Sequence, residues 1–379
     1  MGHAYTPGLM VTERTVVRRR RLLPIPGTVT VQAGSQVTAE TVVAKTDLPG
    51  NVQAINLANV LGIVPDEIRD YLLVKEGEAV KKGGVIAENK PFIKWLKTEV
   101  RSPIQGTLEL VSTVTGQVML REPPRLLHLL AYIDGTVVEV QPQHGVTVET
   151  PCSLLQGIFG VGGEASGEVV MGVKSPEDTL TPSQLSPAMK GKVVVGGAFL
   201  TAETMTRARE IGVAGLVVGG IDDKDLRALL GYDLGVAITG TERVGFTLVL
   251  TEGFGRIPMA GKTFTLLSRR AGQKASLSGA TQIRAGVIRP ELIIPTSDDS
   301  AAIATPRGSG VSEERTGLMI GDEVRVIRDP LFGRIGQVVA LPSDLSRVGT
   351  ESLVRVLEVE FPDKTRAVVP RANVEIIEG

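Results

Sequence analysis

The sequence predicts a multi-domain, mainly β protein that contains one α/β domain. A glycine-valine-alanine pattern occurs twice near the N-terminus, strand and helix signals alternate between Lys192 and Gly272, and short strand patterns resume in about the last sixty residues. The chain has 379 residues, which is more than one hydrophobic core usually organises, because domains typically hold about 100 to 200 residues.

The repeated pattern is a β-hairpin building block. Each copy has a glycine at a turn, a valine three residues later and an alanine seven residues after the valine, and a second half with two glycines ten residues apart. The first halves are Gly34, Val37 and Ala44, and Gly77, Val80 and Ala87; the second halves are Gly106 with Gly116, and Gly135 with Gly145. The duplication predicts an architecture but specifies no reaction.

Residues 22 to about 150 resemble the barrel-sandwich hybrid fold of biotinyl and lipoyl carrier domains and of hammerhead insertions in larger complexes. Residues 74–87, followed by Ser102-Pro103 and Gly106, carry the resemblance. In carrier domains, the hairpin between the two halves holds a modified lysine. Here this hairpin is longer and lacks the usual flanking residues, so Lys94 beside Trp95 is a candidate, with an ordinary surface lysine as the favoured interpretation.

The region from Lys192 to Gly272 predicts a mostly parallel sheet with crossover helices. Residues 193–195 form a strand, and Ala202 to Ile211 form a helix with Thr201 as N-cap and Gly212 after its end.

Glycine turns end the predicted strands of this sheet, at the edge where α/β proteins bind ligands. This edge is the best candidate ligand site, and Glu252 is its candidate acid or base. The alternative interpretation, that the glycines only permit tight turns and close packing, is favoured. The candidate ligand residues are Gly196, Gly197, Gly219, Gly220, Thr251, Glu252, Gly253 and Arg284.

The C-terminal segment that begins at Gly321 resembles the KOW motif in the SH3-like barrels of NusG-type transcription factors and several ribosomal proteins. In those families the barrel contacts RNA, ribosome or polymerase, and Arg325, Arg328 and Arg334 occupy matching positions. Residues 321–379 hold eight Lys or Arg against ten Asp or Glu, and this acidic balance weakens phosphate binding. A barrel that docks on protein is an equally good interpretation.

These patterns divide the chain into five parts. We expect a basic N-terminal arm at 1–21, a barrel-sandwich hybrid region at 22–175, an α/β domain with a β extension at 188–295, a linker at 296–316 and an SH3-like barrel at 317–379. The arm holds the only dense basic block and is interpreted as solvated, with phosphate binding as the alternative.

Composition excludes several classes of function. The formal net charge of −1 provides no global field for nucleic acid or an acidic membrane. The single cysteine, Cys152, excludes a disulfide framework and fits a reducing compartment. The sequence has no run of about 18 apolar residues and no leader, so we expect a cytoplasmic protein without membrane insertion. The three histidines lack metal-ligand spacing, and no catalytic residue, metal or cofactor is predicted.

The sequence therefore favours a non-catalytic modular adaptor or assembly protein that acts through protein-protein contacts, with a protein partner or a homo-oligomer. The first alternative is a factor associated with RNA, ribosome or polymerase through the KOW-like barrel. The second is a small-molecule binder or enzyme at the glycine turns of the α/β domain.

Overall fold

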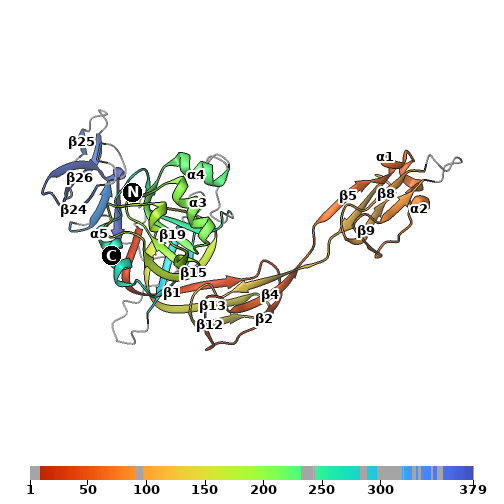
Figure 1. Ribbon diagram of the computed structural model, residues 1–379, viewed down its shortest axis with the longest axis horizontal. Coiled ribbons are helices and arrows are strands. Elements are labelled where there is room, and N and C mark those ends of the chain that lie inside the picture. Colours follow the sequence, from red (N-terminus) through yellow and green to blue (C-terminus); the bar gives the residue numbers. More distant parts are fainter. Residues whose placement is uncertain are drawn as a thin grey trace.

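The computed structural model shows an elongated, mainly β chain with several sheets (Figure 1). A body and a C-terminal unit lie together at one end, a proximal module adjoins the body, and a distal module stands at the far end of a two-stranded ribbon. No helix in the described part of the chain is long and apolar enough to cross a membrane. The structure describes residues 9–89, 97–231, 242, 244–281, 288–296, 318, 320–326, 330–331, 334–342, 345–347 and 353–378.

The proximal module is built from two stretches of chain, residues 9–49 and 123–156. One of its sheets has the order β1-β13-β12-β3 and the other β11-β4-β2, and a shared apolar core lies between them. Its strands are β1 (Leu9–Leu22), β2 (Thr28–Val29), β3 (Gln36–Val37), β4 (Val42–Leu48), β11 (Arg125–Leu130), β12 (Gly135–Gln141) and β13 (Gly145–Gln156).

The basic segment before residue 22 is a strand of this module, so the expectation of a solvated arm at 1–21 is wrong for residues 9–21. These residues pair with β13, from Val11 opposite Leu155 to Leu22 opposite Gly145. Val11 and Val17 are buried, because alternate side chains of a strand point to opposite faces. The arginines that follow continue the strand, and three of them, Arg18, Arg19 and Arg21, pair with acidic side chains.

The distal module is residues 50–122 and has a hydrophobic core of its own. Its main sheet has the order β5-β10-β9-β6, and β7 pairs with β8 in a separate hairpin. The predicted region 22–175 is therefore two modules with two cores, and its last residues belong to the body. The distal elements are β5 (Val52–Asn56), α1 (Leu57–Leu61), the 3-10 helix η1 (Pro65–Glu67), α2 (Ile68–Tyr71), β6 (Ala79–Val80), β7 (Val85–Glu88), β8 (Glu99–Arg101), β9 (Gly106–Ser112) and β10 (Gln117–Arg121).

Each of the two modules forms the same kind of backbone hydrogen bond at its turn glycine. Gly34 donates to the carbonyl of Val137 at 2.7 Å, and Gly77 donates to that of Leu108 at the same distance. Both glycines adopt positive φ, +85° and +86°, which a side chain would strain. The β4/β11 hairpin of the proximal module corresponds to β7/β8, but its tip holds the whole distal module. The modules are thus nested, one within the hairpin of the other.

The body is an α/β unit of residues 157–296. Strands β15, β17, β19 and β20 run parallel in that order, β18 lies parallel beside the end of β19, and β14 pairs antiparallel with β20. Helices α3 and α4 cover one face of the sheet, and α5 packs on the other. The elements are β14 (Phe159–Val161), β15 (Glu164–Met171), β16 (Thr179–Leu180), η3 (Pro182–Gln184), η4 (Pro187–Met189), β17 (Val193–Val195), β18 (Phe199–Leu200), α3 (Ala202–Ile211), β19 (Gly215–Ile221), α4 (Asp223–Leu230), β20 (Thr247–Phe254), α5 (Gly261–Arg269), β21 (Lys274–Ser278) and β22 (Glu291–Pro295).

Residues at the ends of these elements correctly predict where some of them begin and end. The predicted helix Ala202–Ile211 is confirmed at both ends: the Thr201 hydroxyl accepts a hydrogen bond from the backbone of Thr204, and Gly212 ends the helix at φ +77°. The strand Val193–Val195 is confirmed as well.

The C-terminal unit, residues 318–378, has its own apolar core. It is also attached to the rest of the molecule, because β28 pairs in parallel with the start of β1. The predicted linker lies outside the described residues except for Thr296. The elements are β23 (Glu323–Val326), β24 (Ile335–Ala340), β25 (Leu345–Arg347), β26 (Leu353–Glu360), β27 (Arg366–Pro370), η5 (Arg371–Asn373) and β28 (Val374–Glu378).

Separate cores predict separate effects of core mutations. Leu108 is fully buried in the distal module, so Leu108→Ala should destabilise that module by about 2 to 5 kcal/mol. Amide hydrogen exchange should accelerate in β9 and β10 and stay unchanged in β12 and β13. The control Leu110→Ala alters a side chain that is 46% exposed and should have little effect. Equal acceleration in both modules would show that they unfold as one unit.

Candidate functional site

The carboxyl edge of the body sheet is filled by the chain's own backbone. A Cβ atom added to Gly219 would lie 2.2 Å from the carbonyl oxygen of Ile257, and one added to Gly220 would lie 2.1 Å from that of Gly255. The amide of Gly219 donates to the carbonyl of Gly197 at 2.8 Å. These glycines therefore permit close packing of backbone on backbone, the alternative that the sequence favoured over a ligand site.

The other predicted ligand residues are engaged in the same packing. A Cβ atom at Gly196 would contact the side chains of Leu180 and Val218. The hydroxyl of Thr251 donates to the carbonyl of Val218 at 3.4 Å, and Gly253 adopts φ +132° within β20. Arg284 lies outside the described residues.

Glu252 and Arg325, predicted for two separate sites, form one buried ion pair. Nη1 of Arg325 lies 2.5 Å from Oε2 of Glu252, and the two side chains are 3% and 4% exposed. The same nitrogen donates to the backbone carbonyls of Thr251 and Glu252 at 3.1 and 3.2 Å. Oε1 of Glu252 accepts from the amide of Ala260, at the N-terminus of α5, where the helix dipole favours a negative charge.

This pair corrects two predictions. Arg325 is not at a surface where it could bind RNA, because its guanidinium fixes the C-terminal unit to β20 of the body. Glu252 is not available as an acid or base, because both carboxylate oxygens accept hydrogen bonds inside the protein. The C-terminal unit is therefore docked by a buried charge pair as well as by strand pairing.

The remaining basic candidates of the C-terminal unit give little support for phosphate binding. Arg334 lies 3.8 Å from the centre of the Phe361 ring and pairs with Asp363 at 2.6 Å, so its charge is already matched. The hydrogen bonds from Thr365, together with Arg334, hold the pKa of Asp363 below its usual range, which keeps that partner ionised. Arg328 lies outside the described residues.

The candidate modified lysine also lies outside them. Lys94 and Trp95 belong to residues 90–96 at the tip of the β7/β8 hairpin, where no structure is described. The neighbouring Lys97 pairs with Glu88 at 2.7 Å and with Glu99 at 3.4 Å, which closes the base of this hairpin.

The proximal module is joined to the body by the antiparallel pairing of β13 with β22, and one group of charges at this junction is centred on Lys274. Nζ of Lys274, on β21, binds Glu40 at 2.8 Å and Asp134 at 2.9 Å. The other oxygen of Glu40 accepts from the hydroxyl of Ser166 on β15 at 2.6 Å. The hydrogen bond from Lys274, and then that from Ser166, lower the pKa of Glu40 to about 2.

A second group of charges lies on the same side of the module. Arg19 forms a two-pronged pair with Glu291 on β22, and Arg21 forms one with Glu164 on β15. The hydroxyl of Tyr132 donates to Glu291 at 3.3 Å, and burial together with that carboxylate raises the pKa of Tyr132. Tyr132 adopts φ +72°, which costs backbone energy and is held in place by these contacts.

Cys152 lies behind this network and is 1% exposed. Burial raises the pKa of its thiol to about 12, so the thiol is protonated and unreactive at neutral pH. Cys152 is therefore a small apolar residue in the core of the proximal module.

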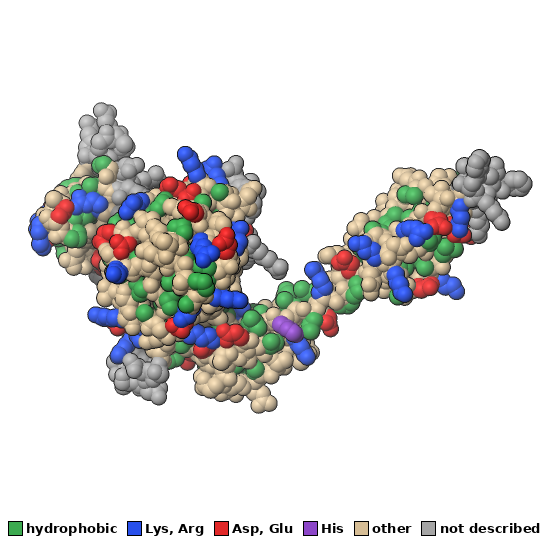
Figure 2. Space-filling model, in the orientation of Figure 1, with side chains coloured by type: hydrophobic (Ala, Val, Ile, Leu, Met, Phe, Trp, Pro, Cys, Tyr) green, Lys and Arg blue, Asp and Glu red, His purple; other side chains and the backbone are tan. Residues whose placement is uncertain are grey.

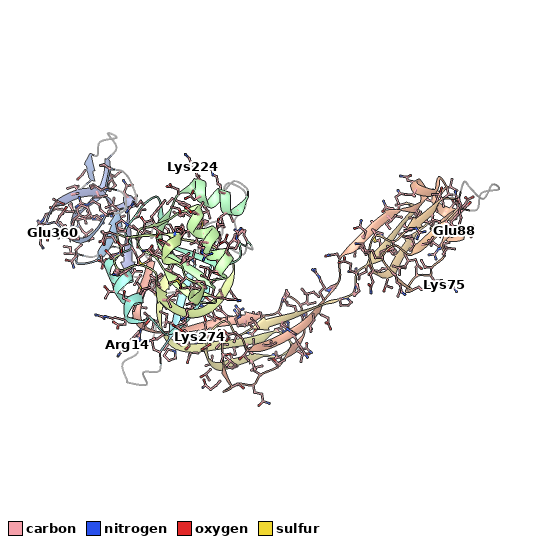
Figure 3. The ribbon with its side chains drawn as sticks, in the orientation of Figure 1. Arg14, Lys75, Glu88, Lys224, Lys274 and Glu360 are labelled. Atoms are coloured by element: carbon pink, nitrogen blue, oxygen red, sulfur yellow. The ribbon has the colours of Figure 1, made fainter. Side chains whose placement is uncertain are left out.

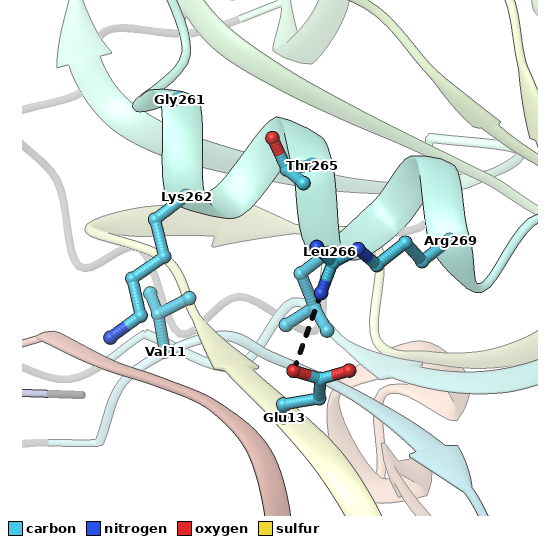
Figure 4. Close-up of a pocket in the computed structure, with 7 residues that line it drawn as sticks. All are labelled: Val11, Glu13, Gly261, Lys262, Thr265, Leu266 and Arg269. Atoms are coloured by element: carbon cyan, nitrogen blue, oxygen red, sulfur yellow. Dashed lines mark ion pairs between the residues drawn. The ribbon is translucent and has the colours of Figure 1, made fainter.

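A hollow of about 270 Å³ lies between β1 and α5 (Figure 4). Arg269 of α5 reaches across it to Glu13 of β1 at 3.6 Å, while Lys262 lines the other end. Its two paired charges balance each other, and nothing in it resembles a reaction centre. Among the residues that the structure describes, no three His, Cys, Asp or Glu side chains lie close enough to hold a metal ion.

The surface is mixed in charge but uneven in exposed apolar side chains. On the face seen in Figure 2, positive and negative side chains alternate without a large area of one sign. The distal module holds 73 of the 379 residues but six of the 14 large apolar side chains that are exposed among the described residues. These six are Val52, Val60, Val64, Leu73, Leu110 and Val114.

Comparison of the chain with protein-family models, with curated proteins and with solved structures gave no significant match. The function of the chain is therefore inferred from its own sequence and structure.

The sequence did not predict the charged residues that join the proximal module to the body. Arg19 and Glu291 are 272 positions apart, and no local pattern connects them. One signal was present: the arginines directly follow Val16 and Val17, so the block continues an alternating strand pattern.

The buried pair predicts a large effect of removing one charge. Glu252→Gln or Arg325→Met should weaken the docking of the C-terminal unit by about 3 to 5 kcal/mol, because each leaves the other group buried without its partner. Faster amide exchange in β23 and β28 measures this effect. The control Lys364→Met changes a side chain that is 82% exposed and should leave exchange unchanged. Unaltered protection in both core variants would refute a structural role for the pair.

The Glu40 contact predicts a dependence on pH. Its pKa is lowered in the folded protein, so its contribution is complete above the ordinary value of 4.5 and is lost as the pH falls through about 2. At pH 7, Glu40→Gln should cost about 0.2 to 1 kcal/mol, because the pair is partly exposed. Unfolding measured between pH 7 and pH 1 should show this difference shrinking as the pH falls through about 2. A difference that is unchanged at pH 1 would contradict the assignment.

Proposed function

We propose that the chain is a non-catalytic adaptor or assembly protein, in which the body is an anchor and the distal module binds a partner protein. The resemblance of both modules to barrel-sandwich hybrids and of the C-terminal unit to SH3-like barrels supports a scaffold built from small binding modules. The buried Glu252–Arg325 pair and the filled sheet edge leave the body without an evident reaction centre among the described residues.

The observation that carries the proposal is the placement of the distal module. It contacts the rest of the chain through the β4/β11 ribbon, stands away from the body, and has a complete core of its own (Figure 1). Lys75 and Glu88 on this module lie at the opposite end of the molecule from Glu360 on the C-terminal unit (Figure 3). A module that served only the stability of the body would gain nothing from this position.

The exposed apolar side chains point to protein as the partner. Val60, Val64 and Val114 are 52%, 54% and 86% exposed. They lie on segments that meet where Gly116 packs against Ala58. Exposed apolar side chains on one small module are typical of a protein-binding surface, whereas nucleic acid requires clustered positive charge.

Removing the module tests the proposal. Leu48 and Arg125 are direct partners across the ribbon, so an Asn-Gly turn can replace residues 49–124 and close the hairpin. The tagged full chain should retain partner proteins from a lysate of its source after nuclease treatment, and the shortened chain should lose them. Amide exchange in β12 and β13 checks that the proximal module stays folded.

Two results would contradict the proposal. Recovery of the same proteins with the shortened chain would place binding elsewhere. Recovery of only those proteins that nuclease removes would favour the alternative, contact with RNA through the C-terminal unit.

A further inference from the structure

The proximal module docks on the body through one defined face, which we call the docking face. It includes Glu40 and Asp134, which bind Lys274, and Arg19 and Arg21, which bind glutamates of the body. Tyr132 lies between these groups and contacts Glu291. One face of this module is thus an interface within the chain.

The duplication identifies the same face on the distal module. The 2.7 Å hydrogen bond of each turn glycine aligns residues 34–44 with 77–87, and the pairing of Val37 with Gly135 and of Val80 with Gly106 aligns the second halves. β10 also pairs with β5 as β13 pairs with β1. The residues that correspond to Arg19, Arg21, Glu40, Tyr132 and Asp134 are Gln53, Ile55, Gly83, Pro103 and Gln105.

The equivalent face of the distal module is open. Gln53, Gly83, Pro103 and Gln105 are exposed, and no segment of the described chain packs against them as the body packs on the proximal module. All five positions are uncharged, so this face lacks the ionic groups with which the proximal module binds the body.

A pair of lysines borders this face. Lys81 and Lys82 are exposed and lie in the turn directly before Gly83. Neither forms an ion pair with any described residue, unlike Arg101 nearby, which binds Glu99 at 2.6 Å. Two unmatched positive charges beside a neutral face favour a partner surface with carboxylates at its rim.

On these observations we propose that this face, with Lys81 and Lys82 at its border, is the binding site for a separate protein that presents an acidic surface. The inference rests on the proposed adaptor function and names the site and the chemistry of its partner.

A second copy of this chain does not fit the face. The docking surface of the body presents Lys274, Glu164 and Glu291, which are matched by charges of the proximal module. Against the neutral distal face these groups would be buried without partners, and Lys274 would add a third positive charge. A second copy therefore does not bind this face through the surface on which its own proximal module docks.

Photo-crosslinking in the full-length protein tests the site. A photo-reactive residue is placed at Gln105, at Val114 on another part of the module, or at Lys224 on the body, and the chain is expressed in its source cell. We expect a protein adduct from position 105, joined to a peptide rich in Asp and Glu, and none from position 224.

Affinity measurements with the purified adduct protein then test the charges. Lys81→Glu with Lys82→Glu should weaken its binding by at least about tenfold, because two attractive contacts become repulsive. The control, Lys45→Glu with Lys75→Glu, makes the same change in net charge at two exposed lysines away from the face and should change affinity less than about twofold. Equal effects of the two variants would overturn the inference.

The crosslinks also separate this inference from the adaptor proposal. Protein adducts from position 114 but not from position 105 would show that the partner binds elsewhere on the distal module. That result would overturn the proposed binding site and leave the adaptor function supported. The absence of protein adducts at both positions would overturn both proposals. Adducts to nucleic acid at position 105 would overturn the proposal that the partner is a protein with an acidic surface.

Discussion

The pairing of β4 with β11 is the constraint on which the arrangement of this molecule depends. Six residues of β11, Arg125–Leu130, pair with β4 and form a ribbon that carries both connections to the distal module. β2 pairs with β4 at Ala44 and Lys45, so beyond these residues the ribbon has only two strands. Two strands alone are only marginally stable in water, so this part of the ribbon is ordered by the folded modules at its two ends. Because two strands lead to the module instead of one linker, its orientation as well as its distance is restricted.

The same nesting explains how one fold serves two roles. Both modules keep the turn glycines and the buried valine and alanine of the repeat, and with them nearly identical backbone hydrogen bonds. The proximal copy has Glu40 where the distal copy has Gly83, and it uses this charge to bind Lys274 of the body. Side chains on one face thus decide whether a copy is fixed to its own chain or remains open to another protein.

Sequence patterns predicted the local elements of this fold and missed the contacts between distant segments. The boundaries of α3 follow from Thr201 and Gly212, which act within one helical turn, and the duplication was visible from its glycines. The pairing of Arg325 with Glu252 joins residues 73 positions apart in different units, and each alone was predicted for a different site. Likewise, the arginines near the N-terminus were expected to be solvated, because their acidic partners come from distant strands.

The separation of the distal module from the body tests the account most directly. Spin labels at Lys75→Cys and Lys224→Cys would report the distance between the distal module and the body by double electron–electron resonance. The native Cys152 is too buried to react with the label. The account predicts one long distance with a narrow distribution, in agreement with the structure. A substantial population at short distance, with the module folded back on the body, would contradict it.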